Sequence, residues 1–251
     1  MRGAFGSWRR FCLVAMVGSL LGACAVPPPA RPPVDPALVK GNILRLADAE
    51  WNAFGGQTIT YENGRERIDP VGVWEDERRG SPRIGQYWRL VGEEWSGYDC
   101  DKPWSAAFIS WLMLEAGVPA QLFPPSGLHS DYLRAIADTE GDPNARFALR
   151  DAKLFRPRPG DLICATRAGA SIPDYNHIPD GTTMHCDLVV FNDGIKLESI
   201  GGNVRNSVSK TVRQLGPDGM LLRDRPWVLV VEDRYPDAVP LVTEAAGKVL
   251  Q

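Results

Sequence analysis

The segment that most constrains the fold is an apolar stretch that follows a proline near the middle of the chain. Ser105 leads into AAFISWLML, a run of mostly apolar residues with several good helix formers. Pro103 favours a helix that begins here, because proline is tolerated in the first turn, where its missing N–H has no intrahelical partner. Asp101 is the expected N-cap, and Gly117 and Pro119 are the expected stop signals. We therefore predict a buried helix over this segment.

The elements around this helix follow the order of an α+β domain. Helical spacing predicts a first helix over 36–54 and another around 130–138, whereas 57–86 is expected to form loops and a short strand pair. The strands expected after residue 156 are 162–164, 187–191, 196–200 and 228–232, with a hairpin signal at 192–194. Helices followed by a small antiparallel sheet predict the α+β class.

Length and charge limit the function classes. A chain of 251 residues with 44% apolar residues can bury one substantial core. Its formal net charge of −3 argues against a nucleic-acid partner, because phosphate recognition depends on a basic surface.

The N-terminus has the pattern of a secretory signal. Arg2, Arg9 and Arg10 precede a short apolar run over 11–21, which is too short to span a bilayer. The following Leu-Gly-Ala-Cys resembles the bacterial lipobox, which implies cleavage before Cys24 and lipidation of its thiol.

The segment after Cys24 predicts an anchored domain on a spacer. Ala25 rather than Asp after the cysteine implies, by resemblance to the lipoprotein sorting rule, the outer membrane on its periplasmic side. The prolines that follow favour an extended spacer. The expected divisions are a signal peptide over 1–23, the lipidated cysteine and spacer over 24–40, the folded domain over 41–240 and a tail over 241–251.

Three cysteines remain in the folded domain, an odd number in an oxidising compartment, so one thiol should stay free. Cys100 and Cys186 are one conceivable bridge. A zinc site of Cys100, Cys164, His185 and Cys186 is the rival, but the sequence lacks the close ligand spacing typical of zinc sites. We expect neither a metal nor a cofactor.

Four motifs carry a family resemblance. PWSAAFISW, RPGDLIC, HCDLVV and GGNVRNSVS, in that order and spacing, resemble the bacterial domain of unknown function 2272 family over roughly 51–222. A helix-start nucleophile, Pro-Gly-Asp-Leu entering a strand and a histidine opening the next strand also resemble the NlpC/P60 and CHAP papain-like hydrolases. The resemblance implies a papain-like domain whose N-terminal helices pack on the sheet. It also places Ser105 where those enzymes carry a catalytic cysteine.

The expected partners of Ser105 follow from the strand that begins near His185. This histidine precedes an apolar run and has an unperturbed pKa suited to a general base. Asn203 is the expected orienting group, with Asp187 as the substitute on the same side of the strand and Glu198 as another.

Three further residues are weaker candidates. His129 is read as an N-terminal helix residue or a cleft-wall contact, and His177 as part of a mobile cover over the cleft. Cys100 is the competing nucleophile, because a thiol near a helix start and a histidine is the better reagent. Pro103, however, places Cys100 just outside the helix.

Two functions remain open. The first is a peptidoglycan amidase or endopeptidase in which Ser105 or Cys100 attacks a stem-peptide amide, His185 is the base and Asn203 orients it. The second is an inactive papain-like domain that binds cell-wall peptide or glycan, or serves as an envelope scaffold.

Overall fold

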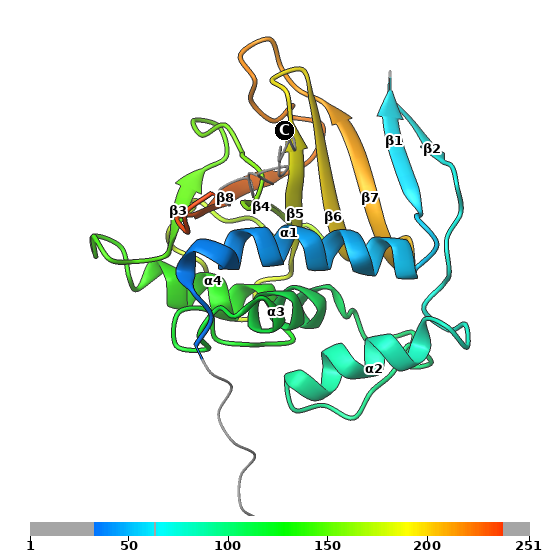
Figure 1. The fold of residues 1–251 in the computed structure, drawn as a ribbon. Coiled ribbons are helices and arrows are strands. Elements are labelled where there is room, and N and C mark those ends of the chain that lie inside the picture. Colours follow the sequence, from blue (N-terminus) through cyan, green and yellow to red (C-terminus); the bar gives the residue numbers. More distant parts are fainter. Residues whose placement is uncertain (1–32, 63, 238–251) are drawn as a thin grey trace, which may run out of the picture. The chain divides into compact units, whose positions relative to one another are not determined.

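Four helices and eight strands form in the part of the chain that the structure, a computed structural model, describes, residues 33–62 and 64–237 (Figure 1). The helices are α1 (Pro36–Ala53), α2 (Ser81–Leu90), α3 (Ser105–Ala116) and α4 (His129–Ala137). The strands are β1 (Thr58–Glu62), β2 (Arg65–Ile68), β3 (Phe147–Asp151), β4 (Leu162–Thr166), β5 (Met184–Asn192), β6 (Lys196–Val204), β7 (Ser207–Gln214) and β8 (Trp227–Asp233). The predicted signal peptide, Cys24 and the tail over 241–251 lie outside the described residues. No helix among the described residues is long and apolar enough to cross a bilayer.

The strands form one open mixed sheet in the order β2-β1-β7-β6-β5-β4-β8-β3. β1 and β7 pair in parallel, and every other neighbouring pair is antiparallel. The α+β class is therefore confirmed, but the expectation of a small, purely antiparallel sheet is wrong. β7 escapes a search for apolar alternation because several of its buried positions are polar, including Ser207, Ser209, Thr211 and Arg213.

The start of α3 differs from the prediction, whereas α1 starts at the predicted residue, although that residue also lies in the segment assigned to the spacer. α3 begins at Ser105 with Trp104 as its N-cap residue and no side-chain cap, so Asp101 is not the cap. Pro103 was expected in the first turn of the helix, but it lies before the N-cap residue Trp104. The predicted end is confirmed, because Gly117 adopts the left-handed conformation with φ 101°. α1 begins at Pro36, inside the segment predicted as spacer, and Asp35 caps it through Ala37 N–H.

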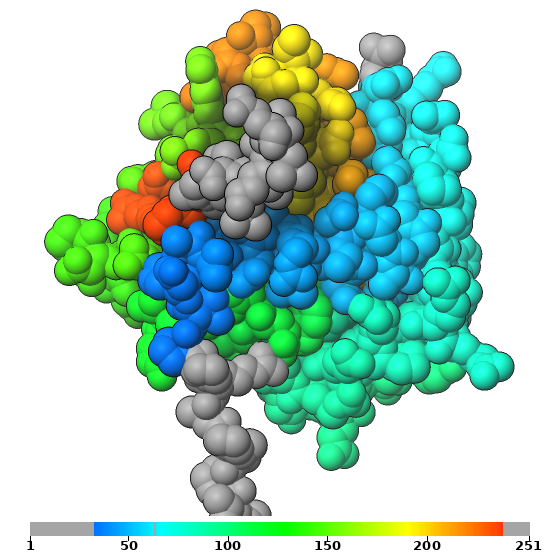
Figure 2. Space-filling view, viewed as in Figure 1, coloured from blue at the N-terminus to red at the C-terminus, as the bar shows by residue number. Residues whose placement is uncertain are grey.

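The main core lies between the helices and one face of the sheet. α3 is buried on nearly every side, and it packs against α1, α2, β5 and β6. α4 contacts β3 and β5, which brings its first turn to the same region as the start of β5. In the space-filling view, α1 is coloured blue and lies at the surface of the described residues (Figure 2). The predicted amphipathic first helix is therefore confirmed, with Ile43 and Ala47 fully buried and Leu38 exposed.

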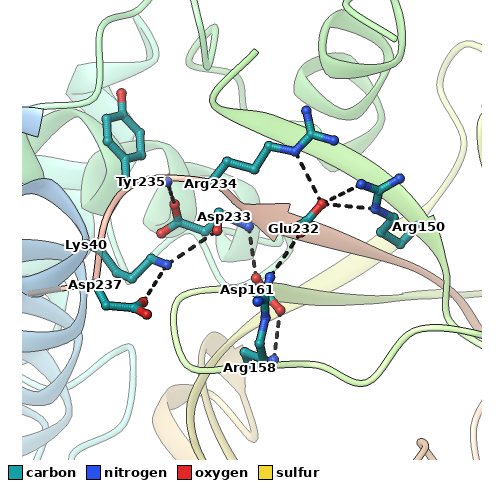
Figure 3. A network of polar contacts seen from close by, with 9 residues as sticks. All are labelled: Lys40, Arg150, Arg158, Asp161, Glu232, Asp233, Arg234, Tyr235 and Asp237. Carbon is teal, nitrogen blue, oxygen red and sulfur yellow. Dashed lines mark hydrogen bonds and ion pairs between the residues drawn. The ribbon is translucent and has the colours of Figure 1, made fainter. Parts of the chain in front are cut away.

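The Pro-Gly-Asp turn before β4 is tied to β8 through the side chain of Asp161 (Figure 3). The Asp161 carboxylate accepts from the N–H groups of Arg158 at 2.7 Å and Asp233 at 2.9 Å. The Asp233 carboxylate in turn accepts from Tyr235 N–H at 2.7 Å. Burial raises the pKa of Asp161 to about 6 and that of Asp233 to about 7, although backbone hydrogen bonds oppose the rise. This motif thus holds the start of β4 in register beside β8.

Candidate active site

Ser105 stands at the first turn of α3 and is almost wholly buried, with 3% of its surface exposed. Its Oγ lies 2.7 Å from the Nε2 atom of His129. The first backbone N–H groups of a helix have no intrahelical acceptor, and no side chain caps them here. Ser105 therefore lies beside both a histidine and a group of N–H donors that favours negative charge.

His129 is the first residue of α4 and is 5% exposed. Its Nδ1 atom forms a short hydrogen bond with the Tyr132 hydroxyl, one helical turn further on. Burial lowers the pKa of His129 well below its ordinary value, and electrostatic interactions with His185 and Arg167 lower it further. His129 is therefore neutral at neutral pH, the state in which one ring nitrogen can accept a proton.

His185 bonds to other partners. Its Nε2 atom lies 2.7 Å from Asp187 Oδ1, and its Nδ1 atom lies 2.9 Å from Arg167 Nη2. Because a guanidinium group can only donate, Nδ1 is the acceptor and Nε2 carries the proton given to Asp187. Both ring nitrogens of His185 are thus occupied, and the histidine hydrogen-bonded to Ser105 is His129. The predicted hydrogen bond between Ser105 and His185 is absent from the described part of the chain.

Asp187 is 1% exposed, and its Oδ2 atom is buried without a hydrogen-bond partner. Burial alone would raise its pKa. The electrostatic attraction and hydrogen bond of His185, together with the charges of Arg225 and Arg213, outweigh burial and hold the pKa of Asp187 well below its ordinary value. Asp187 is therefore ionised and holds the orientation of the His185 ring.

The rings of His129 and His185 lie against each other. The centroids of His129 and His185 lie 5.7 Å apart, with the rings edge to face. The helix-borne set of Ser105, His129 and Tyr132 thus adjoins the strand-borne pair of His185 and Asp187. In this arrangement Ser105 can pass a proton to His129, while the Asp187 carboxylate stays hydrogen-bonded to His185.

Asn203 does not orient His185 in this structure. It lies near the end of β6 with φ 55°, and its side chain forms no hydrogen bond with any described residue. The two preceding glycines do permit a close approach, as expected. A Cβ on Gly201 would lie 1.8 Å from Asp187 Oδ1, and one on Gly202 would lie 2.6 Å from Phe108 Cβ. Asp187, the predicted substitute, is the group that orients His185.

Glu198 lies elsewhere on β6. Its carboxylate accepts from Lys196 Nζ at 2.8 Å. Glu198 therefore pairs with a lysine, whereas the carboxylate bonded to His185 is that of Asp187.

The cysteines pair differently from the bridge considered above. Cys164 and Cys186 face each other across β4 and β5 and form a disulfide, so neither can bind zinc as a thiolate. Cys100 is exposed and free, which confirms that one thiol stays unpaired. Its Sγ contacts the carbonyls of Gly97 and Tyr98 rather than a histidine. No group of three metal-ligating side chains occurs among the described residues.

The loop over 167–183 joins β4 to β5 and packs on α4, the helix that carries His129. Ile178 is buried in the main core, and Asp180 forms an ion pair with Arg134 of α4. Asn176 Nδ2 donates to Glu140 Oε2 at 3.2 Å. His177, a weaker candidate from the sequence, is exposed within this loop. The loop and α4 thus form one packed unit beside the buried Ser105.

The four sequence motifs fall within a region that matches a known family. Residues 75–242 match the family described as "Uncharacterized protein conserved in bacteria (DUF2272)". The chain belongs to the DUF2272 family. The matched region contains both the helix-borne set and the strand-borne pair. No curated protein and no solved structure matches the chain.

Sequence reasoning missed two members of this DUF2272 site and ranked a third too low. Tyr132 stands three residues after His129, and this spacing on a helix places both side chains on one face. Arg167 carries no local signal, because only the pairing of β4 with β5 brings it to His185. His129 itself was a weaker candidate than His185, since its approach to Ser105 depends on how α4 packs against α3.

Proposed function

We propose that this DUF2272 protein is an amide hydrolase with a papain-like arrangement, in which Ser105 is the nucleophile and His129 is the general base. The observation that carries the proposal is the 2.7 Å contact between Ser105 Oγ and His129 Nε2, with Tyr132 on the other ring nitrogen. A nucleophile, a base within hydrogen-bond reach and a third group that orients the base are the signature of an activated hydroxyl.

The chemistry follows from these contacts. When His129 Nδ1 donates to Tyr132, its Nε2 atom accepts the Ser105 proton as Oγ bonds to the substrate carbonyl carbon. The carbonyl oxygen becomes an oxyanion near the uncapped N–H groups of α3. The carbon–nitrogen bond then breaks, and His129 gives its proton to the departing amine. Water releases the acyl group by the reverse proton transfers and restores Ser105.

His185 and Asp187 act through His129 as positioning residues. The imidazolium that forms on His129 during attack is disfavoured by burial and by Arg167, whereas the Asp187 charge favours it. Arg167 is held on His185 by a hydrogen bond, so the position of its guanidinium charge is fixed beside that ring. The strand-borne pair therefore sets the basicity of His129 without contacting the substrate.

The proposed substrate is a peptide amide of the bacterial cell wall. Support comes from the lipobox-like sequence before Cys24, which predicts a lipid-anchored protein of the outer membrane facing the periplasm. The Cys164–Cys186 disulfide agrees with an oxidising compartment. The motif order resembles that of NlpC/P60 and CHAP enzymes, which cleave amides of peptidoglycan stem peptides, and this resemblance favours the same substrate class.

Access to Ser105 requires movement, because only 3% of the residue is exposed. The loop over 167–183 is the segment that we expect to move. It forms an exposed ion pair with Arg134 of α4 and an exposed amide contact with Glu140 just after this helix, both of which are weak in water. We therefore expect a slow opening step before acylation, as in enzymes with loop closure.

The test combines turnover with covalent labelling. Purified full-length protein is incubated with sacculi, and released peptides and new amino groups are measured alongside labelling by a fluorophosphonate probe. In labelling, Ser105 Oγ bonds to phosphorus, fluoride leaves, and His129 takes the proton. We expect Ser105→Ala and His129→Gln to lose at least about 100-fold in both measurements. Ser171→Ala, at an exposed serine without hydrogen bonds to described residues, is the matched control.

Two outcomes contradict the proposal. If Cys100→Ala loses activity while Ser105→Ala keeps it, the nucleophile is Cys100. If the wild type neither labels nor releases peptides, the site is not catalytic for this substrate.

The near-complete burial of Ser105 also favours a second candidate, a papain-like domain that binds cell-wall peptide or glycan without cleaving it. Retained binding of the wild type to sacculi without release or labelling would select this candidate.

A further inference from the structure

Two arginines lie against one tryptophan, and a third bonds to His185 of the strand-borne pair. We call Arg167, Arg213 and Arg225 the arginine cluster. The guanidinium groups of Arg213 and Arg225 lie 5.5 Å and 5.2 Å from the ring centroid of Trp227. Thr166 N–H donates to Pro226 O at 3.2 Å, which places Arg167 next to Arg225 along the paired chains. Arg213 also lies 4.1 Å from the Tyr61 ring, so aromatic rings hold it on two sides.

The positive charge of this cluster exceeds the negative charge that contacts it. Arg213 pairs with Asp224 at 3.2 Å, and among the described residues the Arg167 guanidinium bonds to His185 alone. The Arg225 guanidinium forms no hydrogen bond or ion pair with any residue that the structure describes. Burial lowers the pKa of Arg167 and Arg213, and the charge of Arg225 lowers both further. Among the described residues, Asp224 is therefore the carboxylate paired with the cluster, whereas Asp187 and Glu66 act on it without an ion pair.

Buried donors in the same place lack acceptors. Arg213 is 4% exposed, and its Nε atom has no hydrogen-bond partner. Trp227 Nε1 is also buried without one. Buried N–H groups normally have an acceptor, and a buried cation normally has a counter-charge. Trp227 lies in the wall of a neighbouring pocket, so an acceptor bound there is adjacent to one of these residues.

A pocket opens beside the cluster. It has a volume of about 270 Å³, and Arg225 and Trp227 form part of its wall. Its other charged lining residues are Lys153, Arg223 and Asp218, so the lining is basic. The volume suits a small ligand or one end of a peptide.

We propose that this pocket binds an oxyanion, a carboxylate or a phosphate, through Arg225, the member of the arginine cluster that lies in its wall. Planar guanidinium groups match the two oxygens of such an anion, and a partly buried position strengthens the contact relative to water. The site is distinct from Ser105 and requires no chemistry there. A peptide that ends in a free carboxylate and a free phosphate ion share the required chemistry.

Isothermal titration at low salt tests the site. The probes are the dipeptide acetyl-alanyl-alanine, its C-terminal amide and inorganic phosphate, titrated into the full-length protein. The variants are Arg225→Gln and Arg225→Lys, with Arg79→Gln as the matched control, because Arg79 is exposed and bonds to no described residue. Near-ultraviolet circular dichroism checks that each variant is folded.

We expect the dipeptide to bind with a weak dissociation constant, Arg225→Gln to weaken it at least about tenfold, and Arg225→Lys to weaken it less. Arg79→Gln and wild type should bind alike, and the amide should not bind. If phosphate binds with the same Arg225 dependence while the dipeptide and its amide bind equally weakly, the site is an oxyanion site for free phosphate. Absence of binding by all probes, or binding unchanged in Arg225→Gln, would overturn the proposal. Repeating the titrations in Ser105→Ala separates this result from failure of the hydrolase proposal.

Discussion

Replacing Asp187 with asparagine should cost the fold about 3 kcal/mol at neutral pH. The carboxylate is 1% exposed and accepts a 2.7 Å hydrogen bond from His185. Loss of a charge-assisted hydrogen bond costs about 1.5–3 kcal/mol, and leaving buried positive charge uncompensated raises the total toward about 3–5 kcal/mol. Asparagine also places an amide where Oδ2 already lacks a partner. The isosteric change adds no cavity, so the effect reports the charge.

Urea unfolding measures this loss, with the slope m expected to be unchanged. The melting temperature should fall by about 6–12 °C for a chain of this size. Asp76→Asn is the matched control, because Asp76 is exposed and its carboxylate accepts no hydrogen bond from the described residues. A loss below about 1 kcal/mol would refute the reasoning, because Asp187 would then contribute no more than a surface carboxylate.

The same variant has a definite pH dependence. The folded-state pKa of Asp187 is lowered, so the folded state binds fewer protons than the unfolded chain. Its contribution to stability is therefore complete above the unfolded pKa, near about 4, and is lost as pH falls through the folded value. The stability difference between wild type and Asp187→Asn should stay constant from pH 8 to 5 and shrink below pH 4. A difference that grows in acid would contradict the assignment.

Three further changes test the frame around the site. Gly201→Ala should destabilise the fold by more than about 2 kcal/mol and disturb the His185 ring, because the added Cβ would lie 1.8 Å from Asp187 Oδ1. Thermal unfolding measures the loss of stability, and histidine NMR shifts report the ring. Unchanged stability would refute the close approach. Replacing Cys164 and Cys186 together with alanine should cost about 3 kcal/mol in urea, since the bridge closes a loop with a sequence separation of 22; a cost below about 1 kcal/mol would contradict this. Burial raises the folded pKa of Asp233 to about 7, so the folded state holds a proton that the unfolded chain releases near pH 4, and this contribution to stability is lost between pH 4 and 7. Asp233→Asn should therefore flatten the fall in stability over that range, and an unchanged slope would refute the raised pKa.

Local sequence signals located the elements that carry the site. The start of α3 at Ser105 follows a proline, and its end at Gly117 uses the left-handed conformation that glycine adopts most easily. The Asn-Asp-Gly hairpin signal falls between β5 and β6, and the four motifs correctly indicated the DUF2272 family. These features were readable because each depends on residues close together in the chain.

Tertiary structure decided which side chains meet. His129 and His185 both stood at the start of a predicted element, and only the packing of α4 against the core brings His129 to Ser105. The register of β4 on β5 selects the Cys164–Cys186 bridge and brings Arg167 to His185. β7 was hidden because several of its buried positions are polar, and Ser207, for example, donates to Val73 O, which is distant in sequence. The sequence determined where helices and turns begin, whereas long-range packing chose the base, the disulfide and the charges around them, because those contacts join residues that no local pattern connects.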